Sequence, residues 1–127
     1  MSTYSIVPLS GSTDFRGIKI TTTASAGDTV HSAQSSTTLP DHVTLQIENT
    51  DTSDRPYTVQ WGGTTSPDDK ITGFVPAGMC VTVCDKKPIR NALVVKVFSG
   101  TITVAGVSYT GAANVLVAHG HVQRQLA

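Results

Sequence analysis

The stretch HVTLQIENTDTSDRPYTVQWG, residues 42–62, contains two runs in which apolar and polar residues alternate. Alternation with a period of two is typical of a β-strand that has one buried face and one face in water. Between the runs, NTDTSDRP is rich in residues that form turns. The stretch therefore predicts two half-buried strands joined by a polar loop. The apolar positions of the two strands are Val43, Leu45, Ile47, Tyr57, Val59 and Trp61.

Further short runs rich in β-branched residues occur on both sides of this stretch and are separated by turn-forming residues. We find no sustained helical period with capping residues, so little helix is expected. The pattern predicts an all-β chain, namely a single-domain β-sandwich of the jelly-roll or a related Greek-key type, with a barrel as the alternative. The additional strands expected are Ile18–Ile20, Thr29–Ser32, a strand from Cys80 after a turn at Pro76–Gly78, a hairpin of Leu93–Phe98 and Thr101–Tyr109 joined at Ser99 and Gly100, and Asn114–Gln125.

The chain of 127 residues has the length of one domain. Residues 1–40 are weakly apolar and are predicted to form an N-terminal arm or edge-strand segment, whereas residues 41–127 are predicted to form the sandwich core. Removing residues 1–40 is then expected to leave a soluble fold. Nine basic and nine acidic residues cancel, which argues against nucleic acid or an anionic membrane as a partner. The absence of an apolar leader and of a long apolar run favours synthesis in the cytoplasm as a soluble protein.

Cys80 and Cys84 are the only cysteines of the chain. In a regular strand they would share a face and lie roughly 13 Å apart, too far for a mutual disulfide or a shared metal ion. We expect reduced thiols on one strand face, with a disulfide between subunits as the alternative.

Four other groups of residues are candidates for a binding or catalytic site, and each also has a simpler structural interpretation. His119 and His121 would share a strand face and could hold a metal only if further ligands came near. Tyr57 and Trp61 could form a platform for sugars, but their alternation with polar residues favours burial in the core. Asp68–Lys70 is interpreted as a turn and Asp85–Arg90 as a solvated loop. Because no nucleophile or phosphate-binding motif is present, we predict neither catalytic residues nor a cofactor, and hence no enzyme.

Three segments resemble small virion proteins of tailed bacteriophages: VTLQIENTDTSDRPYTVQWGG, ITGFVPAGMCVTV and ALVVKVFSGTITVAGV. In that family a strand and a polar loop precede a second strand, a VPAG turn introduces a third, and an LVVKV-type hairpin precedes a closing strand. The resemblance covers roughly residues 41–123. It implies a capsid decoration, or cement, protein that is a β-sandwich, assembles as a homotrimer, binds the major capsid protein and resides on the virion surface. It carries no catalytic residues and no cofactor.

Two other functions remain open on the sequence alone. The first is a carbohydrate-binding or adhesin-like module, which depends on Tyr57 and Trp61. The second is a metal-dependent enzyme of the cupin type, which depends on His119 and His121. The leading prediction is a structural protein that bridges the subunits of a phage shell.

Overall fold

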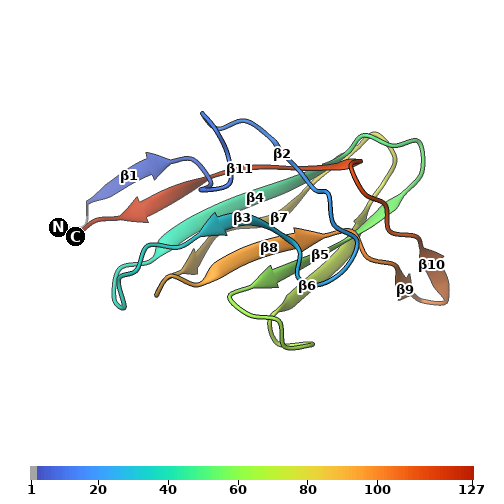
Figure 1. Ribbon diagram of the computed structural model, residues 1–127. Helices are drawn as coiled ribbons and strands as arrows, with labels where there is room; N and C mark the ends of the chain where they lie inside the picture. Colours follow the sequence, from blue (N-terminus) through green and yellow to red (C-terminus); the bar gives the residue numbers. More distant parts are fainter. Residues whose placement is uncertain (1–2) are drawn as a thin grey trace.

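The structure, a computed structural model, describes residues 3–127 and consists of two antiparallel sheets packed face to face (Figure 1). Sheet A contains β1 (Tyr4–Val7), β2 (Ile18–Lys19), β4 (Asp41–Asn49), β7 (Cys80–Ile89) and β11 (Leu116–Gln125). Sheet B contains β3 (Asp28–Ser32), β5 (Arg55–Trp61), β6 (Lys70–Val75) and β8 (Val94–Phe98). A separate two-stranded ribbon is formed by β9 (Ile102–Val104) and β10 (Val107–Tyr109).

The order of the strands is that of a jelly roll. Sheet A runs β1-β11-β4-β7, with β2 also paired to β11, and sheet B runs β3-β8-β5-β6, so that most connections cross from one sheet to the other. Without β1, the eight strands β2 to β8 and β11 form two layers of four, β2-β11-β4-β7 and β3-β8-β5-β6, which is one of the ways in which an all-β chain covers its hydrophobic faces. None of the described residues 3–127 is helical. The predicted all-β sandwich is therefore confirmed.

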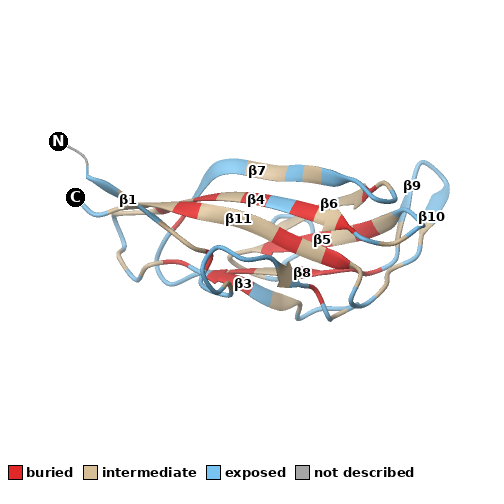
Figure 2. Cartoon of the chain, turned by 90° about the horizontal axis from the view of Figure 1, so that it is seen from above, coloured by how far each residue is buried: buried red, intermediate tan, exposed pale blue. Residues whose placement is uncertain are grey.

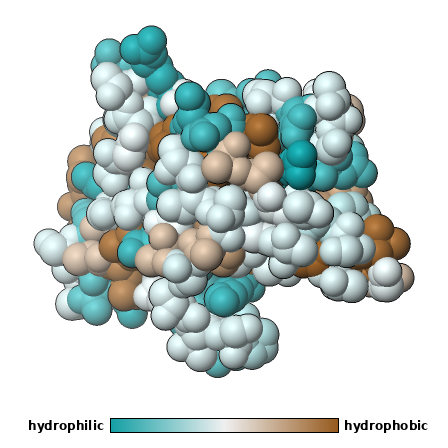
Figure 3. Space-filling view, turned by 45° about the vertical axis from the view of Figure 1, so that its right-hand side comes forward, coloured by the Kyte–Doolittle hydropathy of each residue, from teal (hydrophilic) through white to brown (hydrophobic). Residues whose placement is uncertain are grey.

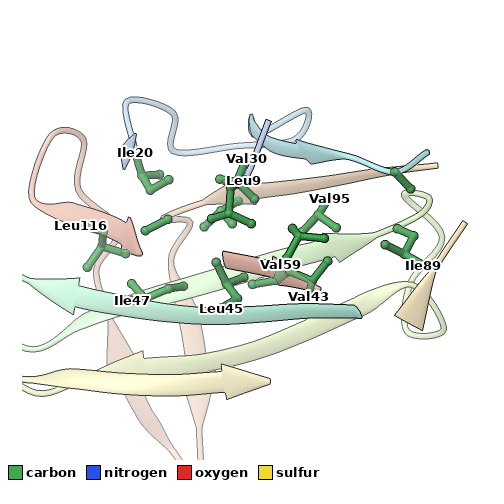
Figure 4. Close-up of a cluster of buried hydrophobic side chains, with 14 of the residues drawn as sticks. Leu9, Ile20, Val30, Val43, Leu45, Ile47, Val59, Ile89, Val95 and Leu116 are labelled. Carbon is green, nitrogen blue, oxygen red and sulfur yellow. The ribbon is translucent and has the colours of Figure 1, made fainter. Parts of the chain in front are cut away.

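The core lies between the two sheets and is built from alternate residues of each strand (Figure 4). Val43, Leu45 and Ile47 of β4 are fully buried, as their alternation predicts. Val59 of β5 and Val95 of β8 meet them from the opposite sheet. Figure 2 shows buried positions along the strands of both layers, while the ends and the connecting loops are exposed. The β-branched side chains of these strands therefore pack closely between the two sheets.

Residues 3–40 belong to the same sandwich. β1 and β2 both pair with β11, and β3 pairs with β8, so these three segments are edge strands of the two sheets. The segment also supplies buried side chains to the common core, namely Leu9, Ile20, Val30 and Ala33. The edge-strand interpretation fits this geometry and the interpretation as a separate arm does not. Because these side chains belong to the common core, we now expect residues 41–127 not to fold alone.

The predicted hairpin joined at Ser99 and Gly100 is wrong. β8 pairs with β3 on one side and β5 on the other, which leaves no side for a following strand. The chain instead leaves the sheet at Ser99, whose hydroxyl donates a hydrogen bond of 2.7 Å to the Pro56 carbonyl. The actual hairpin is β9–β10, which turns at Ala105 and Gly106, both with positive φ (50° and 81°). Such a turn suits the twist of a two-residue hairpin.

Candidate interaction surfaces

His119 and His121 lie on the outer face of sheet A, whereas Ala118 and Val122 on either side of them point into the core. The His119 ring hydrogen bonds to the Glu48 carboxylate at 3.1 Å. Among residues 3–127 no group of three or more histidine, cysteine or acidic side chains is placed to hold a metal ion.

The glycine between these histidines has a structural role. A Cβ at Gly120 would collide with the carbonyl oxygen of Thr44 on the neighbouring strand β4. Glycine is therefore required for the close approach of β11 and β4. The AHGHV sequence is explained by sheet packing at this position.

The two cysteines lie on β7 but do not share a face, so that prediction is wrong. Cys80 is opposite Glu48 and exposed, whereas Cys84 is opposite the core residue Leu45 and packs against the core. The reason is a bulge, because Val83 is an extra residue between these two pairings. Both cysteines are free thiols. Burial raises the pKa of the Cys84 thiol, which makes its reactive thiolate form scarce.

The basic segment Asp85–Arg90 is mostly the end of strand β7, and the predicted loop is therefore wrong. Lys86 has a positive φ of 55° and lies in a second bulge of this strand. Its neighbours Lys87 and Pro88 are exposed at the open edge of sheet A. Charged residues, proline and bulges on an edge strand hinder pairing with another chain. The segment was correctly expected to be solvated.

The acidic segment Asp68–Lys70 forms a turn, in agreement with its interpretation. The Asp69 carboxylate accepts a hydrogen bond from the Thr65 backbone N–H at 3.1 Å. The Lys70 N–H donates to the Pro67 carbonyl oxygen at 3.2 Å. These contacts are local to the loop between β5 and β6.

Tyr57 and Trp61 are half-buried and pack against the core, so the face expected to be buried is covered in part at these two positions. The indole N–H of Trp61 donates to the Pro88 carbonyl oxygen at 3.4 Å, across the gap between the sheets. The Lys87 ammonium lies 5.4 Å from the centre of the Trp61 ring, which is a cation–π contact. Lys87 therefore occupies a face of the indole that a sugar platform would need to expose.

A buried polar network, which sequence reasoning missed, joins the ends of β3, β4 and β11. The Asp41 carboxylate is fully buried and receives hydrogen bonds from His31 Nε2 at 2.8 Å and from Arg124 Nε at 2.8 Å. Asp41 Oδ2, which accepts the bond from His31, also accepts the Gln34 backbone N–H at 3.2 Å. On the other side of the imidazole, the Ser10 backbone N–H donates to His31 Nδ1 at 3.0 Å. The network thus fixes the N-terminal segment to both sheets.

The hydrogen bonds of this network indicate which of its side chains are charged. Because His31 Nδ1 accepts a hydrogen bond, the ring is neutral and its Nε2–H donates to Asp41. Burial lowers the pKa of His31 below its usual value. Burial alone would raise the pKa of Asp41, but the hydrogen bonds from Arg124 and His31 together hold it below its usual value. The ion pair therefore consists of the fully buried, ionised Asp41 and the partly exposed Arg124.

The free energy of unfolding is expected to fall as the pH falls below about 6.5, the ordinary pKa of histidine. In this range the unfolded chain takes up a proton at His31 that the folded chain resists, so acid favours the unfolded state. Urea unfolding monitored by Trp61 fluorescence between pH 5 and pH 8 measures the effect. The variant His31→Gln should have a smaller slope over this range. An unchanged slope would contradict the assignment of His31.

Apolar side chains remain exposed at several separate places on the surface. On the face shown in Figure 3, apolar patches alternate with polar residues. Two sets lie at opposite ends of the sandwich, one near β1 and one on the β9–β10 hairpin (Figure 1). The exposed large apolar residues are Tyr4, Ile6, Phe15, Met79, Leu93, Val104, Val107 and Leu126.

The β9–β10 hairpin extends from the end of the sandwich and is fixed at its base. The Tyr109 ring stacks on Phe74 of β6 with 4.3 Å between ring centres. The Arg55 guanidinium donates to the carbonyl oxygen of Thr110 at 3.0 Å. At the tip, Val104 and Val107 are paired across the hairpin and are 44% and 52% exposed. The hairpin thus presents two valines on a supported projection.

Two shallow hollows occur on the described surface. One, of about 240 Å³, lies between the ends of β5 and β8, and its lining includes Gly62, Leu93 and Lys96. The other, of about 290 Å³, is bordered by Pro40 and Arg90, among others. Neither is lined by histidine, cysteine or carboxylate side chains.

Comparison of the chain with protein-family models, with curated proteins and with solved structures finds no match. Among residues 3–127 no helix has the length and apolar character needed to cross a membrane. The class of protein that the structure defines is a small jelly-roll β-sandwich.

Proposed function

We propose that this protein is a virion structural protein, namely a decoration protein that binds the outer surface of a tailed-phage head and stabilises the shell. The resemblance of residues 41–123 to small virion proteins motivates the proposal. The observation that carries it furthest is the β9–β10 hairpin, because it is a supported projection with an apolar tip. The proposed binding partner of this tip is the major capsid protein of the shell.

The charge distribution along the chain favours a protein partner for the hairpin. No aspartate, glutamate, lysine or arginine occurs between residues 97 and 123, a range that includes the whole hairpin. An uncharged projection loses little solvation when another protein covers it. The cores of protein interfaces are likewise depleted of charged residues. The hairpin therefore has the composition of an interface core.

The fold alone does not select among the candidate functions, because jelly rolls include viral capsid proteins, lectins and cupins. Two side-chain positions favour the structural role. Lys87 covers the Trp61 ring that a sugar platform would use. His119 and His121 project from the outer face of sheet A, away from the interior where a cupin holds its metal.

The hairpin valines provide the test. The double variant Val104→Ser, Val107→Ser should bind the shell at least about 10-fold more weakly, since burying the exposed half of each valine contributes about 0.7 kcal/mol or more. Binding is measured by cosedimentation of the purified protein with phage particles whose gene for this chain has been deleted. The matched control is the double variant Met79→Ser, Leu93→Ser, which replaces two exposed apolar residues outside the hairpin. It should bind the shell as tightly as the natural chain does.

Two outcomes would contradict the proposal. If the natural chain does not cosediment with the particles, it is not a decoration protein. If the natural chain and both double variants bind equally well, the hairpin is not the contact with the shell. Unfolding temperatures of all three proteins establish that the comparison is made between folded chains.

A further inference from the structure

The sheet edges of this sandwich are not equally protected against pairing with another chain. β7 carries two bulges, two lysines and a proline at its exposed end. The backbone of β3 is engaged by the N-terminal segment, since the Gly11 N–H donates to the Val30 carbonyl oxygen at 3.0 Å. On β6, Tyr109 covers Phe74. The features of β7 and β3 hinder the addition of a strand, whereas on β6 one side chain is covered.

The edge formed by β1 has none of these features. Its sequence, Tyr4–Val7, contains no charge, no proline and no irregularity in its register with β11. Tyr4 and Ile6 are 44% and 59% exposed, and they alternate with the half-buried residues Ser5 and Val7. An uncharged edge strand with exposed apolar side chains is a template for pairing.

The hydrogen bonds of β11 show which backbone groups of β1 are free. The Gln125 N–H donates to Pro40 on the β4 side at 3.2 Å, whereas the Leu126 N–H donates to Thr3 on the β1 side at 2.7 Å. In an antiparallel sheet these directions alternate from one residue to the next. The residues of β1 that bond to β11 are therefore odd-numbered.

It follows that the N–H and C=O groups of Tyr4 and Ile6 point away from β11, toward the edge of sheet A that β1 forms. The two residues are separated by one position, so an antiparallel copy of the same strand can place Tyr4 opposite Ile6 and Ile6 opposite Tyr4. This register lies on a two-fold axis at Ser5 and allows four hydrogen bonds between the chains. It also brings an aromatic and a β-branched side chain together across the strands, which is a favourable pair.

We propose that β1 is a self-association site at which a second copy of this chain pairs antiparallel, with Tyr4 of each copy opposite Ile6 of the other. The contact is self-complementary, as a two-fold interface requires. It produces a dimer, whereas the trimer implied by the resemblance needs a different surface. The strand is short, so the dimer is weak and concentration-dependent. The inference does not depend on the proposed function.

Disulfide trapping tests the register. Opposed residues in a hydrogen-bonded pair have Cα atoms about 5.5 Å apart, a separation that suits a disulfide. Chains carrying Tyr4→Cys and chains carrying Ile6→Cys should cross-link when mixed and oxidised. Each variant alone should cross-link far less, because the two identical positions are then diagonal neighbours about 7–8 Å apart. Mass spectrometry of the linked peptides separates this product from links through Cys80 or Cys84.

The oligomeric state provides the second test. At high concentration the natural chain should sediment with up to twice the mass of the 13.3 kDa monomer. Ile6→Pro removes an N–H that points out of the fold, and should raise the dimer dissociation constant about 30-fold because two hydrogen bonds are lost per dimer. Phe15→Ser, which removes an exposed apolar residue elsewhere, is the matched control and should dimerise normally.

Any of three results would overturn the inference. The mixture of Tyr4→Cys and Ile6→Cys chains could cross-link no more than either variant alone. The natural chain could be monomeric or trimeric at all concentrations, or Ile6→Pro could leave the dimer dissociation constant unchanged. If Ile6→Pro fails to fold, Ile6→Lys replaces it, because it keeps the N–H but puts a charge opposite Tyr4 of the second copy.

Discussion

A chain that begins at Asp41 and lacks the first forty residues is expected not to fold. The deletion removes Leu9, Ile20 and Val30, three fully or almost fully buried side chains of the core. Each contributes about 1.5–3 kcal/mol by burial, so their loss amounts to roughly 5–9 kcal/mol. The whole free energy of unfolding of a domain is about 5–15 kcal/mol. The deletion also exposes one side of β8, which loses its partner β3.

The dispersion of amide signals in an NMR spectrum of the fragment 41–127 measures this outcome directly. Collapsed, poorly dispersed signals are expected. Leu9→Ala in the full chain is a graded control that should remain folded with its free energy of unfolding lowered by about 2–5 kcal/mol. A fragment with a fully dispersed spectrum would show that residues 1–40 are dispensable for the fold.

Asp41→Ala is expected to destabilise the folded chain by about 2–5 kcal/mol. The Asp41 carboxylate is the acceptor for His31, Arg124 and the Gln34 backbone N–H. Alanine leaves the His31 and Gln34 donors without an acceptor inside the fold, and it leaves the partly exposed Arg124 without its counter-charge. Urea unfolding at pH 7, followed by the fluorescence of Trp61, gives the difference in free energy between the variant and the natural chain.

The matched control is Asp51→Ala, which removes a carboxylate that pairs with Arg55 at 2.7 Å near the surface and, unlike Asp41, is not fully buried. Ion pairs at the surface contribute little because water and salt screen them. Asp51→Ala should therefore be much less destabilising than Asp41→Ala. Equal effects of the two substitutions would mean that the buried network does not hold the N-terminal segment and the two sheets together.

The regular strands could be predicted from the sequence because their burial alternates with every residue. β4 is the clearest case, since Val43, Leu45 and Ile47 are fully buried and the strand has the expected length. β7 shows the limit of this reasoning. Its bulges insert extra residues, so the face on which Cys84 lies depends on the partner strand, which the sequence of β7 alone does not specify.

Contacts between distant segments were not predictable for a different reason. His31 and Arg124 lie 10 and 83 residues from Asp41, and they meet only because the jelly roll brings β3, β4 and β11 together. The hairpin was misplaced because Ser99–Gly100 has the composition of a turn, whereas its neighbours in the fold hold Ser99 at the end of a sheet. Ala105–Gly106, the actual turn, is a weaker signal than the asparagine–glycine pairs that favour such hairpins.

We propose that this protein decorates a phage shell, and the number of its copies on each particle decides whether it does. Particles are purified on a density gradient from the source culture, and the protein is quantified by mass spectrometry against the main shell protein. A decoration protein should be present in a simple whole-number ratio to the main shell protein, because it is repeated with the symmetry of the shell. If the protein is absent from the particle fraction, it is not a decoration protein.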